Sequence, residues 1–391
     1  MKLSRASDNL IGQKMFQILA KAQELEKKGK KIIHFEIGDP DFNTPLNIKN
    51  AAINSIKNNH THYTNSMGIL ELRKAACKVT LKSRGFKPSI EQVLVTPGAN
   101  FQIFLAISCI INPGDEVIIP DPSFVSYASI VNFLGGKIVN IKLKEENEFR
   151  LNPDDVAKKI TTKTKVVIIN SPHNPTGSVM NKKEIESIYK LVAKNRLYLI
   201  SDEIYSRMIF NDSKTFFFSP SFIDHCKKHT ILINGFSKSY AMTGWRLGVM
   251  TGPENLINKM GLLQETALSC VPKFTQLAGL EALLGSQRKI KEMVLEFKKR
   301  RDLLVSQLNN INGFSCLEPK GAFYVFPNIK KTKLTSEQIS SILLHKCGIA
   351  VAPGNIFGAN GEGYIRICYA NSIKNITNGT SILKNYFGEK R

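Results

Sequence analysis

The sequence predicts an α/β fold with a mostly parallel sheet between helices. Short apolar runs lie near residues 93, 117, 167, 199, 232 and 248, and most of them are separated by stretches with helical periodicity. Small or polar residues follow several of these runs, and open parallel sheets bind ligands at the carboxyl ends of their strands. With 391 residues, the chain is long enough for two domains, or for one large and one small domain.

The composition narrows the possible functions. Hydrophobic residues make up 42% of the chain and charged residues 22%, which is typical of a soluble globular enzyme. No apolar run is long enough to span a membrane, and the N-terminal segment lacks the apolar centre of a signal peptide, so we expect a cytoplasmic protein without a membrane partner. The seven cysteines are scattered and the seven histidines form no ligand cluster, which predicts reduced thiols and no metal site.

The net charge of +22 raises the alternative of a nucleic-acid-binding module. The basic residues, however, are spread over nearly every predicted helical surface, as at residues 27–31 and 298–301, and no basic stripe carries interleaved aromatic residues. This distribution favours a solvated, lysine-rich surface that also steers anionic substrates and cofactor. No nucleic-acid partner is therefore expected.

The N-terminal part of the chain predicts a helix, a short strand and a loop. Residues 13–29 carry apolar side chains at helical spacing, which indicates an amphipathic helix. Residues 32–35 predict the strand. The following segment, residues 37–45, contains two prolines and is typical of a loop.

Two strands with ligand-binding potential follow. Residues 92–95 predict a strand that leads through Gly98 and Ala99 into a buried helix. Small residues at the start of a helix leave backbone N–H groups free to bind an anion, and the helix dipole favours this. Residues 116–119 predict the next strand, after which Phe124 could lie flat on a planar ligand or pack in the core.

Residues 165–169 and 197–200 predict two further strands, each followed by polar residues. A turn over residues 170–177 follows the first strand, and Asp202 follows the second. A carboxylate at the end of a buried strand requires a cationic partner. His173 lies between two prolines, where we expect it to orient the loop or to face solvent rather than to act as a base.

Residues 231–248 form the centre of the predicted site. Lys238 follows an apolar run and lies among small residues, although lysine normally keeps its charge in water. Ser237 precedes it and Arg246 follows eight positions later (246 − 238), and both side chains suit a phosphate dianion. Pyridoxal 5′-phosphate requires an imine-forming amine beside a phosphate site, and its pyridinium nitrogen would be a cation for Asp202. For the Ser-Lys pair alone, a solvated loop lysine is the alternative.

The chain after the last strand is rich in helices, predicted over residues 257–284 and 289–308. Residues 319–327 and 363–370 predict strands, and the second contains Arg366 in an otherwise apolar run. A buried arginine requires an anion, and its planar fork suits a carboxylate, so we expect Arg366 to anchor the α-carboxylate of a substrate. A buried ion pair with an aspartate or glutamate is the alternative.

Several strings together resemble the class I/II pyridoxal-phosphate aminotransferases. Residues 235–248 match the lysine-attachment motif of that family, here G-F-S-K-x-x-A-M-x-G-x-R-L-G, at every defining position. Residues 38–45 are similar to its G-x-P-D-F-x-T-P strip, and residues 63–73 to its Y-x-x-x-x-G-x-x-x-L-R segment. Residues 171–177 are close to its N-P-x-N-P-T-G segment, and residues 319–324 resemble its P-x-G-A-F-Y segment. The resemblance therefore covers nearly the whole chain in the family's order.

This resemblance implies fold type I, with a large domain built on a mixed, mostly parallel sheet and a smaller α/β domain. Residues 1–45 would form an N-terminal arm and helix that belong to the small domain, residues 46–285 the large cofactor domain, and residues 286–391 the small C-terminal domain. The active unit would be a homodimer with shared active sites, in which Tyr63 reaches the phosphate of the neighbouring site.

The resemblance also implies ping-pong transamination from an L-amino acid to a 2-oxo acid, through an aldimine on Lys238. Lys238 would move the proton from Cα, Asp202 would keep the ring nitrogen protonated, and Tyr205 would act on the phenolate oxygen. The cofactor-binding residues would be Tyr63, Gly98, Ala99, Asn100, Phe124, Asn174, Asp202, Tyr205, Ser237, Lys238 and Arg246. The substrate-binding residues would be Gly38, Asn174 and Arg366.

One position departs from the family's pattern. Asn100 stands where aspartate-specific members of the nearest subgroup carry a lysine that binds the distal carboxylate. This argues against aspartate as the preferred donor, so aspartate, alanine and aromatic donors stay open, with 2-oxoglutarate as the acceptor by family habit. A carbon–sulfur β-lyase or another lyase on the same fold would use the same lysine. A binding protein that has lost catalysis is a further alternative.

Overall fold

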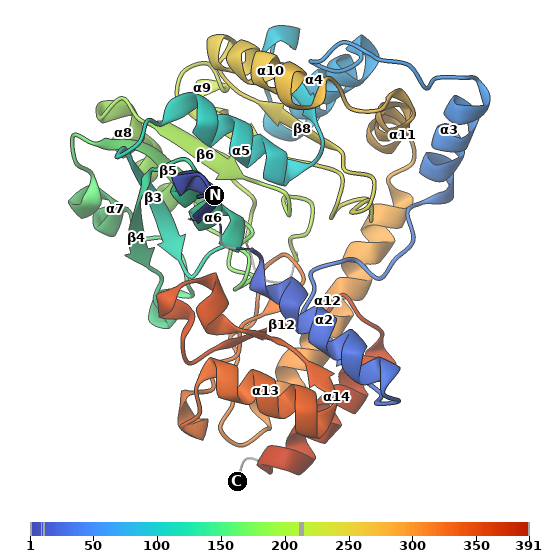
Figure 1. Cartoon of the computed structure of the whole chain (residues 1–391), viewed down its shortest axis with the longest axis vertical. Coiled ribbons are helices and arrows are strands. Elements are labelled where there is room, and N and C mark those ends of the chain that lie inside the picture. The colour runs from blue at the N-terminus through green and yellow to red at the C-terminus, as the bar shows by residue number, and fades with distance from the viewer. Residues whose placement is uncertain (1, 9, 11, 211–214, 390–391) are drawn as a thin grey trace.

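The computed structural model describes residues 2–8, 10, 12–210 and 215–389 and centres on a seven-stranded sheet (Figure 1). The strand order is β2-β8-β7-β6-β5-β3-β4. β8 is antiparallel to both of its neighbours, whereas the other neighbouring pairs are parallel. The strands are β2 (Val93–Thr96), β3 (Glu116–Asp121), β4 (Lys137–Lys142), β5 (Thr164–Asn170), β6 (Tyr198–Asp202), β7 (Thr230–Ile233) and β8 (Gly248–Thr251).

The six apolar runs near residues 93, 117, 167, 199, 232 and 248 all lie in this sheet, which confirms the mixed, mostly parallel α/β fold. Strand β4 has no counterpart in the predictions. Its sequence, KIVNIK, mixes polar and apolar residues, and only Ile141 of this edge strand is buried. Such a strand lacks the continuous apolar run that marks a strand covered on both faces.

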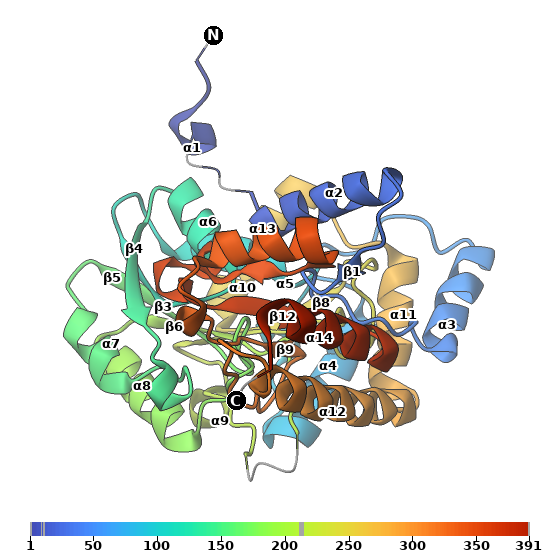
Figure 2. The same ribbon diagram turned by 90° about the horizontal axis from the view of Figure 1, so that it is seen from below.

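Helices cover both faces of the sheet (Figures 1 and 2). On one face, Val166 of β5 packs in a cluster with Ile103 and Ile257, which lie on two of the covering helices. On the other face, the next residue of β5, Val167, packs in a cluster with Ile185 of a third helix. Successive side chains of a strand point to opposite faces, so β5 is apolar from Val166 to Ile169 because both of its faces are buried there.

The helices follow the expected distribution, with one break. Residues 257–284, predicted as helical, form two helices that are interrupted around Ser269, whose φ is +72°. The helices are α1 (Arg5–Asp8), α2 (Lys14–Lys27), α3 (Leu46–Lys57), α4 (Leu70–Arg84), α5 (Ala99–Ile110), α6 (Val125–Phe133), α7 (Pro153–Lys159), α8 (Lys182–Lys194), α9 (Ser221–Asp224), α10 (Glu254–Leu268), α11 (Lys273–Leu284), α12 (Arg288–Asn309), α13 (Ser336–Cys347) and α14 (Ile373–Phe387).

A second group of short strands joins the two ends of the chain. Strand β1 (Ile33–His34) pairs in parallel with β10 (Ile349–Ala350), which places N-terminal residues beside C-terminal ones. In a separate three-stranded sheet, β12 (Ile365–Cys368) lies between β11 (Ala352–Pro353) and β9 (Tyr324–Val325). The strand predicted over residues 319–327 is therefore much shorter than expected.

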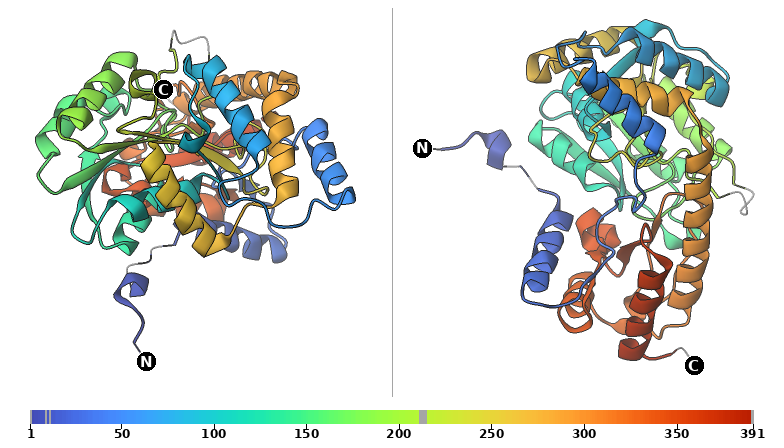
Figure 3. Two further views of the ribbon diagram at one scale, coloured as in Figure 1. Left: turned by 90° about the horizontal axis from the view of Figure 1, so that it is seen from above. Right: turned by 90° about the vertical axis from the view of Figure 1, so that its right-hand side faces the viewer.

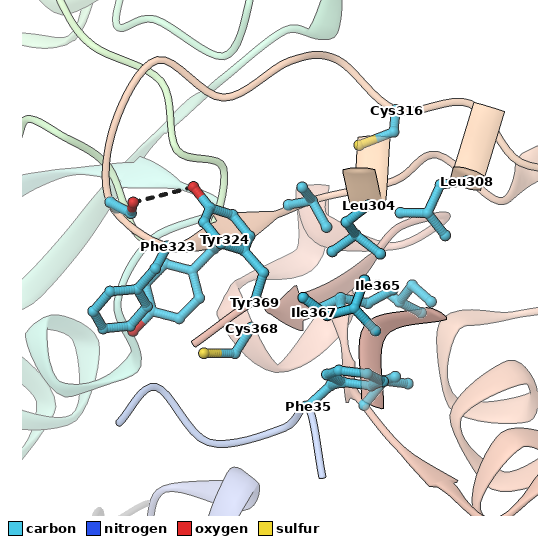
Figure 4. Close-up of a cluster of buried hydrophobic side chains, with 14 of the residues drawn as sticks. Phe35, Leu304, Leu308, Cys316, Phe323, Tyr324, Ile365, Ile367, Cys368 and Tyr369 are labelled. Atoms are coloured by element: carbon cyan, nitrogen blue, oxygen red, sulfur yellow. Dashed lines mark hydrogen bonds between the residues drawn. The ribbon is translucent and has the colours of Figure 1, made fainter. Parts of the chain in front are cut away.

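The core around these short strands contains residues from distant parts of the sequence (Figure 4). Phe35 from the N-terminal segment packs in the same cluster as Leu304 of α12 and Ile367 of β12. The long helix α12 extends from the level of the large sheet down to this cluster, as the right-hand view of Figure 3 shows. The segment that follows β1 is thus anchored in this core just before residues 37–45.

Three further structural findings concern the described residues. Within the described residues, no helix combines the length and apolar character needed to cross a membrane. The same residues contain no group of three or more His, Cys, Asp or Glu side chains arranged to hold a metal ion. All seven cysteines carry free thiols.

Helix α12 offers a matched pair of leucines that tests the core described above. Leu304 is 1% exposed and Leu295 on the same helix is 61% exposed. We expect Leu304→Ala to lower the free energy of unfolding by about 2–5 kcal/mol, because it removes buried methyl groups and leaves a cavity. Leu295→Ala should change it by less than about 0.5 kcal/mol. Urea unfolding followed by circular dichroism measures both, and equal effects would contradict the assignment of this core.

Candidate active site

A cavity of about 460 Å³, here called the central cavity, lies at the carboxyl ends of β5 and β6 beside the start of α5. It also borders the loop after β7 and residues from the N-terminal segment. The structure brings together here most of the residues that the sequence analysis singles out. They are Gly38, Ala99, Asn100, Phe124, Asn174, Asp202, Tyr205, Ser237, Lys238, Arg246 and Arg366.

Lys238 places its amine at the centre of this cavity. Its Nζ donates a hydrogen bond to the carbonyl oxygen of Gly38, 2.5 Å away. Burial lowers the pKa of the amine to about 8, and the positive charges of Arg366 and Arg246 act in the same direction, while Asp39 opposes them. A lysine with this pKa carries a sizeable neutral fraction near neutral pH, and a neutral amine is the nucleophilic and basic form.

An anion-binding site lies where α5 begins. Gly98 precedes the helix with φ +89°, and a Cβ at this position would lie 2.6 Å from Nη2 of Arg246, so only glycine allows this approach. Arg246 stays accessible and is held by a hydrogen bond of 2.7 Å from its Nη1 to the carbonyl oxygen of Thr243. Ser237 lines the cavity nearby. A helix N-terminus, a guanidinium and a hydroxyl together suit a phosphate dianion.

Asp202 is a buried carboxylate at the end of β6. Its Oδ2 accepts a hydrogen bond of 2.6 Å from the hydroxyl of Tyr127, and its Oδ1 accepts one of 3.1 Å from the N–H of Ile204. Burial raises the pKa of Asp202 to about 6, although both hydrogen bonds stabilise the anion and oppose this shift. A cation placed in the cavity would supply the compensation that the carboxylate lacks.

Arg366 is almost fully buried, and its guanidinium lies between two aromatic rings. The guanidinium carbon is 4.5 Å from the ring centre of Tyr324 and 4.7 Å from that of Phe357. Nη2 donates to the carbonyl oxygen of Glu36 at 2.5 Å, and Nη1 donates to Oδ1 of Asn174 at 3.1 Å. Nε is buried without a hydrogen-bond partner, and no carboxylate of the described residues forms an ion pair with this arginine.

The contacts of Arg366 favour an external anion over the buried ion pair. Two neutral oxygens do not balance a buried positive charge, so the guanidinium can still gain a carboxylate. Because Oδ1 of Asn174 is used by Arg366, the amide NH₂ of Asn174 stays available to donate into the cavity.

Tyr205 contributes a hydroxyl to the cavity that Asn174 also lines. Its Oη lies 2.8 Å from the hydroxyl of Tyr324, and burial raises the pKa of both tyrosines, so both stay protonated at physiological pH. A Cβ on Gly38 would lie 1.9 Å from Oη of Tyr324, which explains the requirement for glycine at this point of the N-terminal segment.

Residues 37–45 lie across the lysine loop and are fixed to it. Thr243 donates to Oδ1 of Asp39 at 2.8 Å, and Thr44 donates to the carbonyl oxygen of Ala241 at 2.5 Å. Asp41 forms an ion pair of 2.7 Å with Arg300 of α12. The segment predicted as a loop is therefore held against the site by specific polar contacts.

Three predicted residues need separate comment. Phe124 is partly buried, lines the cavity and packs edge-on against Tyr127 with ring centres 5.6 Å apart, so it is available to a planar ligand while it contributes to the core. Tyr63 is 87% exposed and does not line the cavity of its own chain. The prediction that His173 could face solvent is wrong: the ring is buried and bonds Thr176 through Nδ1 at 2.8 Å, which orients the loop.

Other cavity residues have no counterpart in the predictions. Tyr127 and Tyr324 hydrogen-bond to predicted residues, but their own positions in the sequence resemble ordinary core positions. Met15 and Phe16 come from the first turn of α2, where the periodicity indicates only an amphipathic helix. Ile37 is a third apolar residue that lines the cavity.

The side chains of the central cavity fit pyridoxal 5′-phosphate. The amine of Lys238, with its lowered pKa, can react with the aldehyde of the cofactor. The start of α5 and Arg246 can bind the phosphate, and the buried carboxylate of Asp202 can pair with the pyridinium nitrogen. The hydroxyl of Tyr205 and the amide of Asn174 can donate to a phenolate oxygen. No part of this set requires a metal ion.

Comparisons with known proteins agree with this chemistry. The family described as aminotransferase class I and II matches residues 30–381. An aspartate aminotransferase of Pyrococcus horikoshii is 42% identical over 90% of each chain, and an aromatic-amino-acid aminotransferase 2 of Thermococcus litoralis is 39% identical over 92% of each chain. The solved structure of the Thermus thermophilus aspartate aminotransferase with maleate has a TM-score of 0.94 at 33% identity, covering 98% of this chain and 99% of that chain.

The pKa of Lys238 can be measured in the cofactor-free protein. We expect its acetylation by acetic anhydride to reach half of the maximal rate at about pH 8, whereas an exposed lysine titrates near the ordinary value of 10.5. Peptide mass spectrometry across a pH series gives both midpoints. In Asp39→Asn the midpoint should fall further, because Asp39 raises the pKa of this amine. A midpoint above pH 10 for Lys238 would show that burial does not perturb it.

Proposed function

Because this chain belongs to the class I and II aminotransferase family, we propose that Lys238 and the groups around it form its transamination site. The chain is a pyridoxal-phosphate-dependent aminotransferase of fold type I, which transfers an amino group between an amino acid and a 2-oxo acid. The observation that carries the assignment of the site is the Lys238 amine with a pKa of about 8, enclosed in the one cavity that also contains Asp202, Arg246 and Arg366.

The cofactor, when bound, supplies an aldehyde for the incoming amine and a ring that accepts the electrons of the bond broken at Cα. Lys238 holds the cofactor covalently and gives way to the amino substrate. Its Nζ then takes the proton from Cα of the substrate and returns it on the cofactor side. The lowered pKa increases the fraction of neutral Nζ that is ready for this task near neutral pH.

Asp202 and Tyr127 act together at the ring nitrogen. A carboxylate there keeps the nitrogen protonated, and a protonated ring withdraws electrons more strongly. The hydrogen bond from Tyr127 opposes the effect of burial and helps Asp202 to stay anionic. Asn174 and Tyr205, which line the cavity, would donate to the phenolate oxygen, and Phe124 would cover one face of the ring.

The remaining contacts would fix two anionic groups, the phosphate of the cofactor and the α-carboxylate of the substrate. The start of α5, formed by Gly98, Ala99 and Asn100, would bind the phosphate together with Ser237 and Arg246. The N–H groups of Ala99 and Asn100 would donate to it, whereas the N–H of Gly98 already donates to the carbonyl oxygen of Thr96 at 2.8 Å. Arg366 binds the α-carboxylate of the substrate through its planar fork, with Asn174 and the backbone at Gly38 beside it. With both ends fixed, Cα lies against Nζ of Lys238.

The reaction proposed in detail is ping-pong transfer from an L-amino acid to a 2-oxo acid. The comparisons do not favour the lyase alternative, since the relatives named above are aminotransferases. Those relatives are named for aspartate and for aromatic amino acids, so both stay candidates as donors here, together with alanine. 2-Oxoglutarate is proposed as the acceptor.

We propose the domain boundaries given above: residues 46–285 for the large domain, and residues 286–391 with residues 1–45 for the small domain. The pairing of β1 with β10 and the burial of Phe35 against Ile367 support assigning the N-terminal segment to the small domain. A cytoplasmic location is proposed as well, in line with seven cysteines that all carry free thiols.

Absorbance spectroscopy of the holoenzyme tests the proposed function. Addition of an amino donor without acceptor should convert the cofactor to its amine form, and addition of 2-oxoglutarate should reverse the change. Borohydride reduction before donor addition, followed by peptide mapping, should place the pyridoxyl label on Lys238. Lys238→Ala should lose both the label and the spectral change. A label on another lysine, or release of ammonia in place of the reversible change, would contradict the proposal.

The exposed position of Tyr63 leads to a prediction about assembly. We propose a homodimer in which Tyr63 of one subunit binds the phosphate in the other, so Tyr63→Ala should weaken cofactor binding. A mixed dimer of Lys238→Ala and Tyr63→Ala chains would then hold one site with both native residues. At a cofactor concentration too low to load the Tyr63→Ala homodimer, it should recover activity that neither homodimer has, measured after co-expression with two affinity tags. Lack of recovery in a purified mixed dimer would place Tyr63 outside the site.

A further inference from the structure

One wall of the central cavity is not used by any of the contacts proposed so far. It consists of Met15 and Phe16 from the first turn of α2, and of Ile37, which directly precedes Gly38. Phe16 is 56% exposed although it is aromatic. An apolar ring that stays accessible at the edge of a ligand cavity can bury apolar surface when a ligand binds. We call these three residues the apolar wall.

Each cationic side chain that lines the cavity already has a proposed role toward the cofactor or the α-carboxylate of the substrate. These side chains within the described residues are Lys238, Arg246 and Arg366, and each has a role at the amine, the phosphate or the α-carboxylate. The remaining charged side chain near the apolar wall is the acidic Asp39, which hydrogen-bonds to Thr243. Among the described residues of this chain, a second carboxylate on the substrate would therefore meet apolar groups and an acid, without a further cation to compensate its loss of hydration.

The placement of the apolar wall decides which part of a substrate it contacts. Met15 touches the guanidinium of Arg366, with Sδ 3.2 Å from Nη2, and Ile37 lies between Glu36, which accepts from Arg366, and Gly38, which accepts from Lys238. The wall thus borders both the α-carboxylate anchor and the reactive amine. The substituent that extends from Cα past these two groups is the side chain of the amino acid.

Resting on the proposed function, we propose that the apolar wall receives the side chain of the amino donor and selects apolar donors, aromatic or branched aliphatic, over dicarboxylic ones. Burial of such a side chain against Met15, Phe16 and Ile37 stabilises the complex. A carboxylate of the same size would lose hydration there without gaining an ion pair. Selection therefore depends on the polarity and charge of the side chain and not on its size.

Leucine, asparagine and aspartate test this directly with the holoenzyme, because their side chains have the same branched shape and differ only in polarity and charge. We expect kcat/KM of the half-reaction to fall in the order leucine, asparagine, aspartate, with at least a tenfold difference between the first and the last. Phenylalanine should be at least as good as leucine. A value for aspartate equal to or above that for leucine would overturn the proposal, including the case in which a second subunit supplies a cation.

A matched pair of variants on α2 locates the selection. Phe16→Lys places a cation on the apolar wall and should shift the ratio of kcat/KM for leucine over aspartate at least tenfold toward aspartate. Gln17→Lys adds the same charge to the next residue, which is exposed and does not line the cavity, and should leave the ratio unchanged. Equal shifts in both variants, or none in Phe16→Lys, would overturn the role of the wall.

The outcomes separate this inference from the function on which it rests. If aspartate is preferred but still converts the cofactor reversibly, the transaminase assignment stands and the apolar wall is rejected. If no amino acid converts the cofactor while borohydride still labels Lys238, the proposed function fails, and the inference about the donor fails with it.

Discussion

The parallel arrangement of β5 and β6 is the constraint on which the site depends. Both strands end at the same edge of the sheet, and β7 brings the chain to the same edge before the lysine loop. Asn174, Asp202 and Lys238 therefore meet although they are far apart in the sequence. Because these strands are buried on both faces, their apolar runs secure the edge at which Asp202 lies and from which the loops with Asn174 and Lys238 begin.

Buried charge is the second determinant of the site. Asp202 and Arg366 are each satisfied only in part: hydrogen bonds hold them in place, but neither has an ion-pair partner among the described residues. A fully paired site would have little to gain from a ligand, and a wholly unpaired one would not be stable. The incomplete pairing is consistent with a cofactor and a substrate that bring the missing charges, a pyridinium and a carboxylate.

The sequence was sufficient for the sheet and for most of the residues in the cavity, for a physical reason. Continuous apolar runs mark strands covered on both faces, and a lysine, an aspartate or an arginine at the end of such a run is costly enough to indicate chemistry. Tyr127 and Tyr324 could not be found in this way, because a buried tyrosine is common and its hydroxyl partner depends on tertiary packing. Strand β4, at the edge of the sheet, lacked the apolar run for the same kind of reason. His173 orients the loop, which is one of the two expected roles, but its burial could not be predicted, because two flanking prolines indicate a turn without determining whether the turn is buried.

The N-terminal segment links substrate selection to proton transfer. Strand β1 fixes this segment in the core of the C-terminal residues, and the next residues contact the two groups that define the substrate position: Glu36 accepts from Arg366, and Gly38 accepts from Lys238. Ile37 lies between them and faces the cavity. A side chain that fits poorly against this segment would displace the carbonyl groups that orient the arginine and the amine. In this arrangement a mismatched donor would bind more weakly and would also transfer its proton more slowly. The reason is that the same few residues contact the donor side chain and orient Arg366 and Lys238.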